Sequence, residues 1–152
     1  MSLDVTTLRQ SFDRIAERNP EMTFRFYDIL FERYPQAKPL FARTNPMAQT
    51  RMLSEALRAV LVHLEDGAWL ERTLKGLGAR HVNYGVTEPM YAWVGDALLR
   101  TLAEVEGDDW TESVAKAWTD AYGAIASLML AGAAEEEAKR AAKSRPVLEV
   151  AS

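Results

Sequence analysis

The chain has 152 residues, of which 48% are apolar and 26% are charged, so it can bury one core and does not have the composition of a disordered protein. Its net charge of −4 excludes a concentrated basic face, and we expect no nucleic-acid partner. No apolar run approaches the roughly 18 residues of a membrane span. The first ten residues also lack the layout of a signal peptide. Because there are no cysteines and only two histidines, disulfides, thiolate nucleophiles and multi-histidine metal sites are excluded. We therefore expect a single cytoplasmic domain.

The elements predicted in chain order are all helices, because apolar residues recur every three or four positions and no long two-residue alternation occurs. Asn19-Pro20 and Asn45-Pro46 each fit an N-cap followed by proline in the first turn, and Thr87-Glu88-Pro89 gives a similar signal. The predicted helices span residues 4–18, 20–34, 35–41, 46–65, 69–82, 88–105 and 109–135. Residues 136–152 lose the apolar pattern and are predicted to form a charged tail whose first residues can remain helical.

Three polar side chains stand at positions where the helical pattern calls for an apolar one. His81 follows Leu77 by four residues, Gln49 precedes Leu53 by four, and Tyr27 lies within an aromatic stripe. Taken singly, each fits a structural role: a hydrogen-bonded core histidine, a solvated glutamine and a core tyrosine. Taken together, they also fit a haem site, because a neutral imidazole facing an apolar pocket suits an axial iron ligand. A phenol and an amide on the opposite wall could then hydrogen-bond a bound gas.

A series of segments extends this pattern over some 110 residues. In order they are FYDILFERYP at 26–35, PLF at 39–41, MAQTRML at 47–53, LGARHVNYGV at 77–86, YAWVGDALLRTL at 91–102 and KAWTDAYGAIASLM at 116–129. In order and spacing, the series resembles a bacterial single-domain globin, close to the haem domains of flavohaemoglobins and similar to neuroglobin-like chains. The resemblance implies an all-α globin fold, a three-over-three helical sandwich around a haem pocket. Residues 1–135 would form the globin domain and residues 136–152 the tail.

The resemblance also implies roles for single residues in binding haem b and its gas ligand. His81 corresponds to the proximal iron ligand, and Tyr27 and Gln49 to the distal pair. The remaining positions line the cofactor: Leu53 beside the gas ligand, Phe41, Val86 and Val94 in haem packing, and Tyr91 on the proximal side.

Three further polar residues are open to two interpretations. Glu135 corresponds to the glutamate that completes a Tyr–His–Glu network in flavohaemoglobins, but it is also one of three consecutive glutamates at a helix end, and we favour the solvated position. Arg80 fits either a propionate partner or, as we prefer, a surface residue. His63 lies off the apolar stripe of its helix and is predicted at the surface.

The first functional hypothesis is a haem globin that reversibly binds dioxygen, for transport or storage, and that also binds CO and NO. The second is a nitric oxide dioxygenase or peroxidase-like enzyme served by a separate reductase, since a chain of this length leaves no room for the flavin and nicotinamide domains of a flavohaemoglobin. The third is a haem-free signalling module with a globin fold, against which His81, Phe41 and the distal pair argue. A fold does not by itself decide among these functions.

Overall fold

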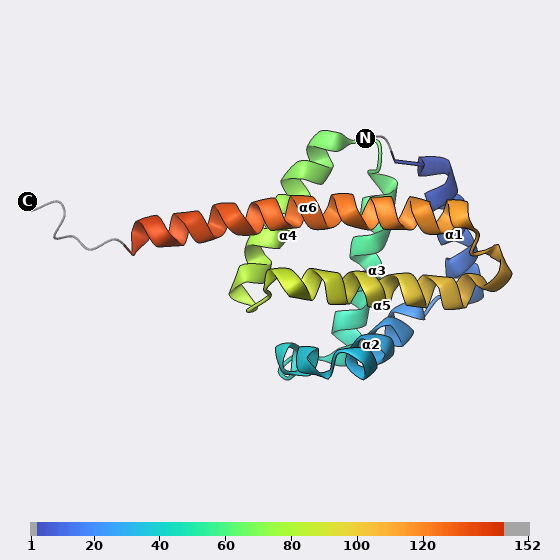
Figure 1. Ribbon diagram of the computed structural model, residues 1–152, viewed down its shortest axis with the longest axis horizontal. Helices are drawn as coiled ribbons and strands as arrows, with labels where there is room; N and C mark the ends of the chain where they lie inside the picture. Colours follow the sequence, from blue (N-terminus) through green and yellow to red (C-terminus); the bar gives the residue numbers. More distant parts are fainter. Residues whose placement is uncertain (1–2, 145–152) are drawn as a thin grey trace, which may run out of the picture.

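The computed structural model describes residues 3–144, and all regular elements within that range are helical (Figure 1). The elements are α1 (Val5–Arg18), α2 (Met22–Arg33), the 3₁₀ helix η1 (Pro35–Phe41), α3 (Pro46–Val62), α4 (Gly67–Asn83), α5 (Glu88–Glu106), the 3₁₀ turn η2 (Gly107–Asp109) and α6 (Glu112–Lys143). The predicted all-α class is confirmed. None of the helices described is long and apolar enough to cross a bilayer.

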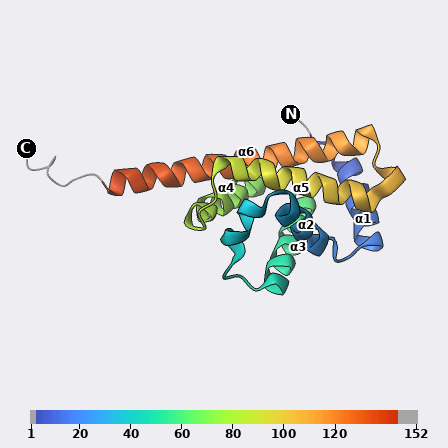
Figure 2. The same cartoon turned by 60° about the horizontal axis from the view of Figure 1, so that its bottom comes forward.

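The helices form the predicted three-over-three sandwich. Helices α5 and α6 lie side by side and cross α1, α3 and α4, while α2 packs against α5 (Figures 1 and 2). The larger apolar core lies between α1, α2, α5 and α6 and includes Leu8, Ile15, Phe26, Leu30, Leu102 and Trp118. A smaller cluster of Leu74, Tyr91 and Met129 joins α4, α5 and α6.

The helix ends agree with the sequence in one place and differ in another. Asn45 caps α3 as predicted, because its side-chain oxygen accepts from the backbone N–H groups of Met47 and Ala48. Asn19, in contrast, does not begin α2. Its backbone N–H closes the last turn of α1, its side-chain oxygen accepts from the Glu21 N–H at 3.1 Å, and α2 starts only at Met22.

Helix α6 is longer than the stretch predicted for it. It begins after the η2 turn and continues through Lys143, so residues 136–143 of the predicted tail are helical (Figure 1). Arg140 contributes to this extension, since its guanidinium donates to Glu136 one turn earlier and to the Asn83 side chain at the end of α4. Residues 145–152 of the tail lie outside the described residues.

Helices α4 and α6 meet at two glycines. A Cβ atom added at Gly78 would lie 1.9 Å from the backbone oxygen of Met129, and one added at Gly132 would lie 2.0 Å from that of Lys75. Any side chain larger than hydrogen at either position would push the helices apart. The two backbones therefore touch, and this contact sets the position of the C-terminal half of α4.

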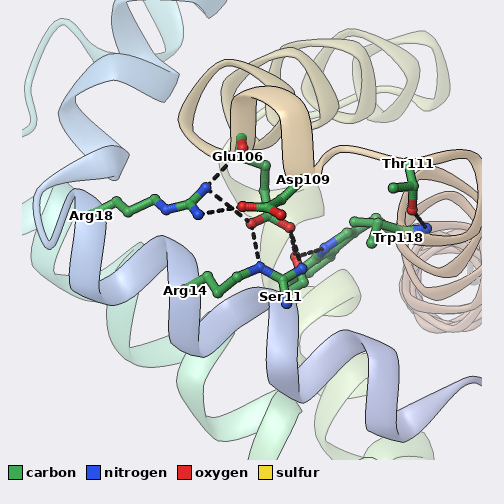
Figure 3. A network of polar contacts seen from close by, with 8 residues as sticks. Ser11, Arg14, Arg18, Glu106, Asp109, Thr111 and Trp118 are labelled. Atoms are coloured by element: carbon green, nitrogen blue, oxygen red, sulfur yellow. Dashed lines mark hydrogen bonds and ion pairs between the residues drawn. The ribbon is translucent and has the colours of Figure 1, made fainter.

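A buried polar network joins α1 to the end of α5, and we call it the Glu106 clamp (Figure 3). The Glu106 side chain is fully buried, and its carboxylate accepts from Nε and Nη2 of Arg14, at 2.9 and 2.8 Å. It also accepts from the Ser11 hydroxyl at 2.8 Å, and the Trp118 indole N–H donates to that hydroxyl at 2.8 Å. Arg18 donates to the Glu106 carbonyl and pairs with Asp109. The clamp consists of these six residues.

Candidate functional site

His81 lies in the last full turn of α4, half-buried, three residues after the Gly78 contact. Its Nδ1 lies 2.8 Å from the Leu77 carbonyl oxygen. Since a carbonyl can only accept, Nδ1 must carry the proton, and Nε2 keeps its lone pair. Burial lowers the pKa of His81, which favours the neutral ring. The side chain is thus a neutral imidazole with an oriented ring and a free nitrogen, as metal ligation requires.

Tyr84, for which the sequence suggested no role, also packs against the imidazole. Its ring meets the His81 ring edge to face, with centroids 5.5 Å apart, while more than half of Tyr84 stays exposed. The signal available in the sequence was the spacing, because residues three apart share a helix face. The Val86 backbone N–H donates to the His81 carbonyl at 3.2 Å, which ties the segment after α4 to the histidine.

Tyr27 and Gln49 form a pair between α2 and α3. The Gln49 amide nitrogen lies 3.1 Å from the Tyr27 hydroxyl and donates to it. The Tyr27 ring packs on Phe26, Phe31 and Phe41, with centroid distances of 4.9, 5.9 and 5.5 Å. Burial raises the pKa of Tyr27, so the phenol stays protonated. Because the Tyr27 hydroxyl oxygen accepts the hydrogen bond from Gln49, the phenol O–H can itself donate a hydrogen bond to another group.

The apolar residues predicted to line the site fall into two groups. Phe41, Leu53 and Val94 pack against the larger core, together with Tyr27. Val86 and Tyr91 belong to the smaller cluster beneath α4. Phe41, Leu53, Val86 and Val94 are only half-buried, although they are apolar. The protein therefore leaves part of this apolar lining uncovered.

The Tyr91 hydroxyl is a buried group that lacks a partner. Tyr91 is 8% exposed, and among the described residues its hydroxyl is the one buried side-chain polar atom without a hydrogen bond. The Tyr91 carbonyl, by contrast, accepts from the Tyr122 hydroxyl at 2.6 Å. Burial raises the pKa of Tyr91, so this phenol also stays protonated. An unpaired buried hydroxyl costs free energy, which a bound group could recover.

Glu135 lies away from the imidazole and is bound elsewhere. Its carboxylate accepts from Lys75 at 3.2 Å and is largely exposed, while the His81 Nδ1–H donates to the backbone instead. Arg80 is exposed, as we preferred. His63, predicted at the surface, is half-buried at the end of α3, where its ring stacks on Trp69 with centroids 3.9 Å apart.

The donor set fits haem better than a bare metal ion. In residues 3–144 there is no group of three or more His, Cys, Asp or Glu side chains that could hold a metal ion. A single histidine is a sufficient protein ligand only if the metal brings most of its other ligands, as iron in a porphyrin does. The half-buried apolar lining and the unpaired Tyr91 hydroxyl fit a large, flat, mostly apolar group.

Comparison with known proteins agrees with this chemistry. The family model described as globin matches residues 24–129. The chain belongs to the globin family. Leghemoglobin-1 of Lupinus luteus is 31% identical to this globin over 142 residues, which cover 84% of this chain and 91% of the relative. A flavohemoprotein of Bacillus anthracis is 30% identical over 133 residues, or 86% of this chain and 33% of the relative. This globin thus spans about a third of the flavohemoproteins that it matches.

Solved structures give the same family. An engineered carbene transferase made from a putative nitric oxide dioxygenase of Rhodothermus marinus has a TM-score of 0.77 at 26% identity and covers 93% of this globin and 96% of its own chain. A bacterial globin of Campylobacter jejuni has a TM-score of 0.73 at 26% identity, with coverages of 86% and 94%. Relatives in this family bind haem, and globins bind diatomic gases.

Proposed function

We propose that this globin holds haem b through His81 and reversibly binds dioxygen between the haem and the Tyr27–Gln49 pair. The observation that carries the proposal is the 3.1 Å hydrogen bond from Gln49 to Tyr27, which leaves the phenol O–H of Tyr27 able to donate a hydrogen bond to another group. Haem, when bound, would supply an iron that can bind a diatomic gas. The cytoplasmic location predicted from the sequence stays a prediction.

On the proximal side, the chain would control the charge on the ligating nitrogen. The Leu77 carbonyl accepts the Nδ1 proton of His81, and a neutral acceptor gives the imidazole little anionic character. A carboxylate in that position would make the imidazole a stronger electron donor, which bond cleavage in peroxide or dioxygen needs. Glu135 is engaged by Lys75 instead. This arrangement supports reversible binding.

On the distal side, the Tyr27 hydroxyl of α2 would donate to a polar gas ligand, and Gln49 of α3 would support that phenol. A bound dioxygen would carry partial negative charge, so the Tyr27 O–H would donate to it, while Gln49 donates to the Tyr27 hydroxyl. The aromatic rings around Tyr27 exclude water, which strengthens these bonds. Carbon monoxide is less polar when bound and gains less from the same donors.

A second candidate is nitric oxide dioxygenation, or a peroxidase-like reaction, with electrons from a separate reductase. Its support is the similarity to flavohemoproteins and to the putative nitric oxide dioxygenase of Rhodothermus marinus. The same distal pair would serve that reaction. We rank it second because His81 donates to a backbone carbonyl and not to a carboxylate.

The experiment begins with absorption spectra of the purified protein, ferric, ferrous, oxygenated and with CO. The lack of a Soret band after haem addition would favour a haem-free signalling module and end the proposal. With haem bound, Tyr27→Phe should speed dioxygen dissociation about ten- to a hundredfold, since a hydrogen bond to a charged acceptor contributes roughly 1.5–3 kcal/mol. Carbon monoxide dissociation should change much less.

The matched control is Tyr34→Phe, because the Tyr34 hydroxyl donates to Asp96, and its ring stacks on Trp93. That variant should keep the parent rate for both gases. Equal acceleration of both gases in Tyr27→Phe would indicate a steric role and contradict the proposed hydrogen bond. Turnover of nitric oxide with a supplied reductant, at a rate far above autoxidation, would favour the second candidate.

A further inference from the structure

Helix α4 ends in a capping motif that includes the backbone of His81. The Val86 backbone N–H donates to the His81 carbonyl oxygen at 3.2 Å, and the Gly85 N–H donates to the Val82 carbonyl oxygen at 3.1 Å. These two bonds form a Schellman motif, in which the residue after the cap has a left-handed backbone. Gly85 has that backbone, with a φ of +80°. The residue that would ligate iron is therefore held by the bond that closes its helix.

The backbone of Gly85, and not the space around it, requires a glycine. A Cβ atom added there would lie 3.8 Å from its nearest neighbour, a methyl carbon of Leu40, which is an ordinary contact. A φ of +80°, in contrast, is costly for any residue that has a Cβ atom. Within residues 3–144 the other glycine with a positive φ is Gly107, at the end of α5, with a φ of +56°. The two glycines thus offer the same kind of strain at different places in the fold.

The motif places the ring of Tyr84 against the imidazole. Tyr84 is the cap residue of α4, and its backbone N–H donates to the His81 carbonyl oxygen at 3.1 Å. Its ring meets the imidazole with centroids 5.5 Å apart and planes at 62°. Tyr84 is 58% exposed, and neither of the two apolar clusters described above includes it. The ring therefore contributes little to the core, and its contact with His81 is the interaction that its place in the cap provides.

Two contacts together restrict the rotation of the imidazole. The Leu77 carbonyl accepts from Nδ1 of His81, but a carbonyl oxygen accepts over a broad range of directions, so this bond alone leaves the ring some freedom to turn. Leu77 lies one turn before His81 and Tyr84 one turn after it, so the ring is held from both directions along the helix. An edge-to-face pair has a preferred geometry, which adds the restraint that the hydrogen bond lacks.

We propose that Tyr84 is a positioning residue that, held by the Gly85 motif, fixes the orientation of the His81 imidazole and so the direction in which Nε2 is presented. The inference rests on the proposed function, because it concerns the ring that would ligate haem iron. A ligand ring that is already oriented loses little freedom when it binds, which favours retention of the cofactor. The aromatic ring of Tyr84 makes the contact, so phenylalanine should replace tyrosine here.

The first test uses the full chain without haem and measures, by nuclear magnetic resonance, how fast the Nδ1 proton of His81 exchanges with solvent. Turning of the imidazole breaks the bond to Leu77, so Tyr84→Leu should speed this exchange about two- to tenfold, the range that corresponds to an aromatic pair worth roughly 0.5–1.5 kcal/mol. Tyr84→Phe should keep the parent rate. The matched control is Phe24→Leu, which removes another exposed aromatic ring, on α2, and should also keep it. Parent-like exchange in Tyr84→Leu would overturn the proposal.

A second pair of variants tests the motif, and it replaces Tyr84→Leu if circular dichroism shows that variant to be unfolded. Gly85→Ala and Gly107→Ala each force an alanine into a positive φ, so both should lower the stability of the fold. Only Gly85→Ala should speed the exchange of the His81 proton beyond the parent rate. Equal acceleration in both variants would indicate general destabilisation and would overturn the role of the motif.

The last test adds haem and measures the ferrous iron–histidine stretch by resonance Raman spectroscopy, together with the rate of haem loss. Tyr84→Leu should shift or broaden the band and speed haem loss, whereas Tyr84→Phe and Phe24→Leu should match the parent. A purely structural role would speed haem loss without moving the band, and that result would overturn positioning. If the parent binds no haem, the proposed function fails, while the exchange rates still decide whether Tyr84 orients the imidazole.

Discussion

The Glu106 clamp and the surroundings of His81 satisfy their buried polar groups to different degrees. In the clamp, a fully buried carboxylate is met by Arg14 and Ser11, and the indole of Trp118 completes the network (Figure 3). Around the site, apolar side chains are only half-buried, and the Tyr91 hydroxyl has no hydrogen-bond partner within residues 3–144. A region that satisfies its own groups can hold the fold together alone. A region that does not is built for a bound molecule, which here fits haem.

The largest effect is expected at His81, which would hold the haem iron. His81→Ala should lose most of the haem, because the chain has only one other histidine, His63, and that ring stacks on Trp69 at the end of α3. After haem addition, the free energy of unfolding of His81→Ala should equal that of the haem-free protein. The reason is that a ligand that binds only the folded state stabilises it, and this variant would lose that ligand. The control His63→Ala should keep its haem. A normal haem spectrum for His81→Ala would remove this residue from the site.

The next largest effect is expected in the Glu106 clamp, and it tests whether the clamp stabilises the fold without haem. Glu106→Gln leaves Arg14 without its buried counter-charge and should cost about 2–4 kcal/mol in urea unfolding, with or without haem. Glu104→Gln is the control, because Glu104 forms a similar pair with Arg25 but is half-exposed, so the change should be far smaller. If the two variants lose equal stability, the clamp owes nothing to burial.

A smaller effect is expected at the backbone contact between α4 and α6, which positions His81 without contacting the ligand. Gly78→Ala introduces a Cβ atom 1.9 Å from a backbone oxygen of α6 and should destabilise the protein by about 1–3 kcal/mol while speeding haem loss. Gly76→Ala lies on the same helix with its nearest atom, in the Arg80 side chain, at 3.7 Å, and should be neutral or up to about 1 kcal/mol more stable. Equal stability of the two variants would argue against the backbone contact between α4 and α6.

The smallest effect is expected at Glu135, where the test separates an oxygen carrier from a haem enzyme. Glu135→Gln should leave the ferrous iron–histidine stretch and the ferric/ferrous potential unchanged, because Glu135 pairs with Lys75 and His81 donates to the Leu77 carbonyl. Resonance Raman spectroscopy and a redox titration measure these quantities. A fall in stretching frequency together with a rise in potential would show that Glu135 acts on the imidazole, and would favour the enzyme.

Local patterns predicted much of the fold. The three- to four-residue period identified the helices, and Asn45-Pro46 marked the start of α3 correctly. At Asn19-Pro20 the same signal failed, because Asn19 closes α1 and turns the chain for two more residues before α2 begins. An N-cap pattern describes only which groups can bond, and the angle between two consecutive helices decides which of them do.

The sequence by itself determined the helical class, the placement of His81 on a mostly apolar helix face and the polar character of Tyr27 and Gln49, since these follow from residue types at short spacings. Tertiary structure alone decided the partners. Glu106 precedes a glycine at a helix end, where the sequence offers no sign of burial, yet α1 covers it with two arginines. Likewise, the Glu135 carboxylate of α6 accepts from Lys75 of α4, a pairing that helix packing creates between segments far apart in the sequence. The physical reason is that a buried group bonds to whatever distant segment packing brings within about 3 Å, and sequence spacing carries no record of that distance.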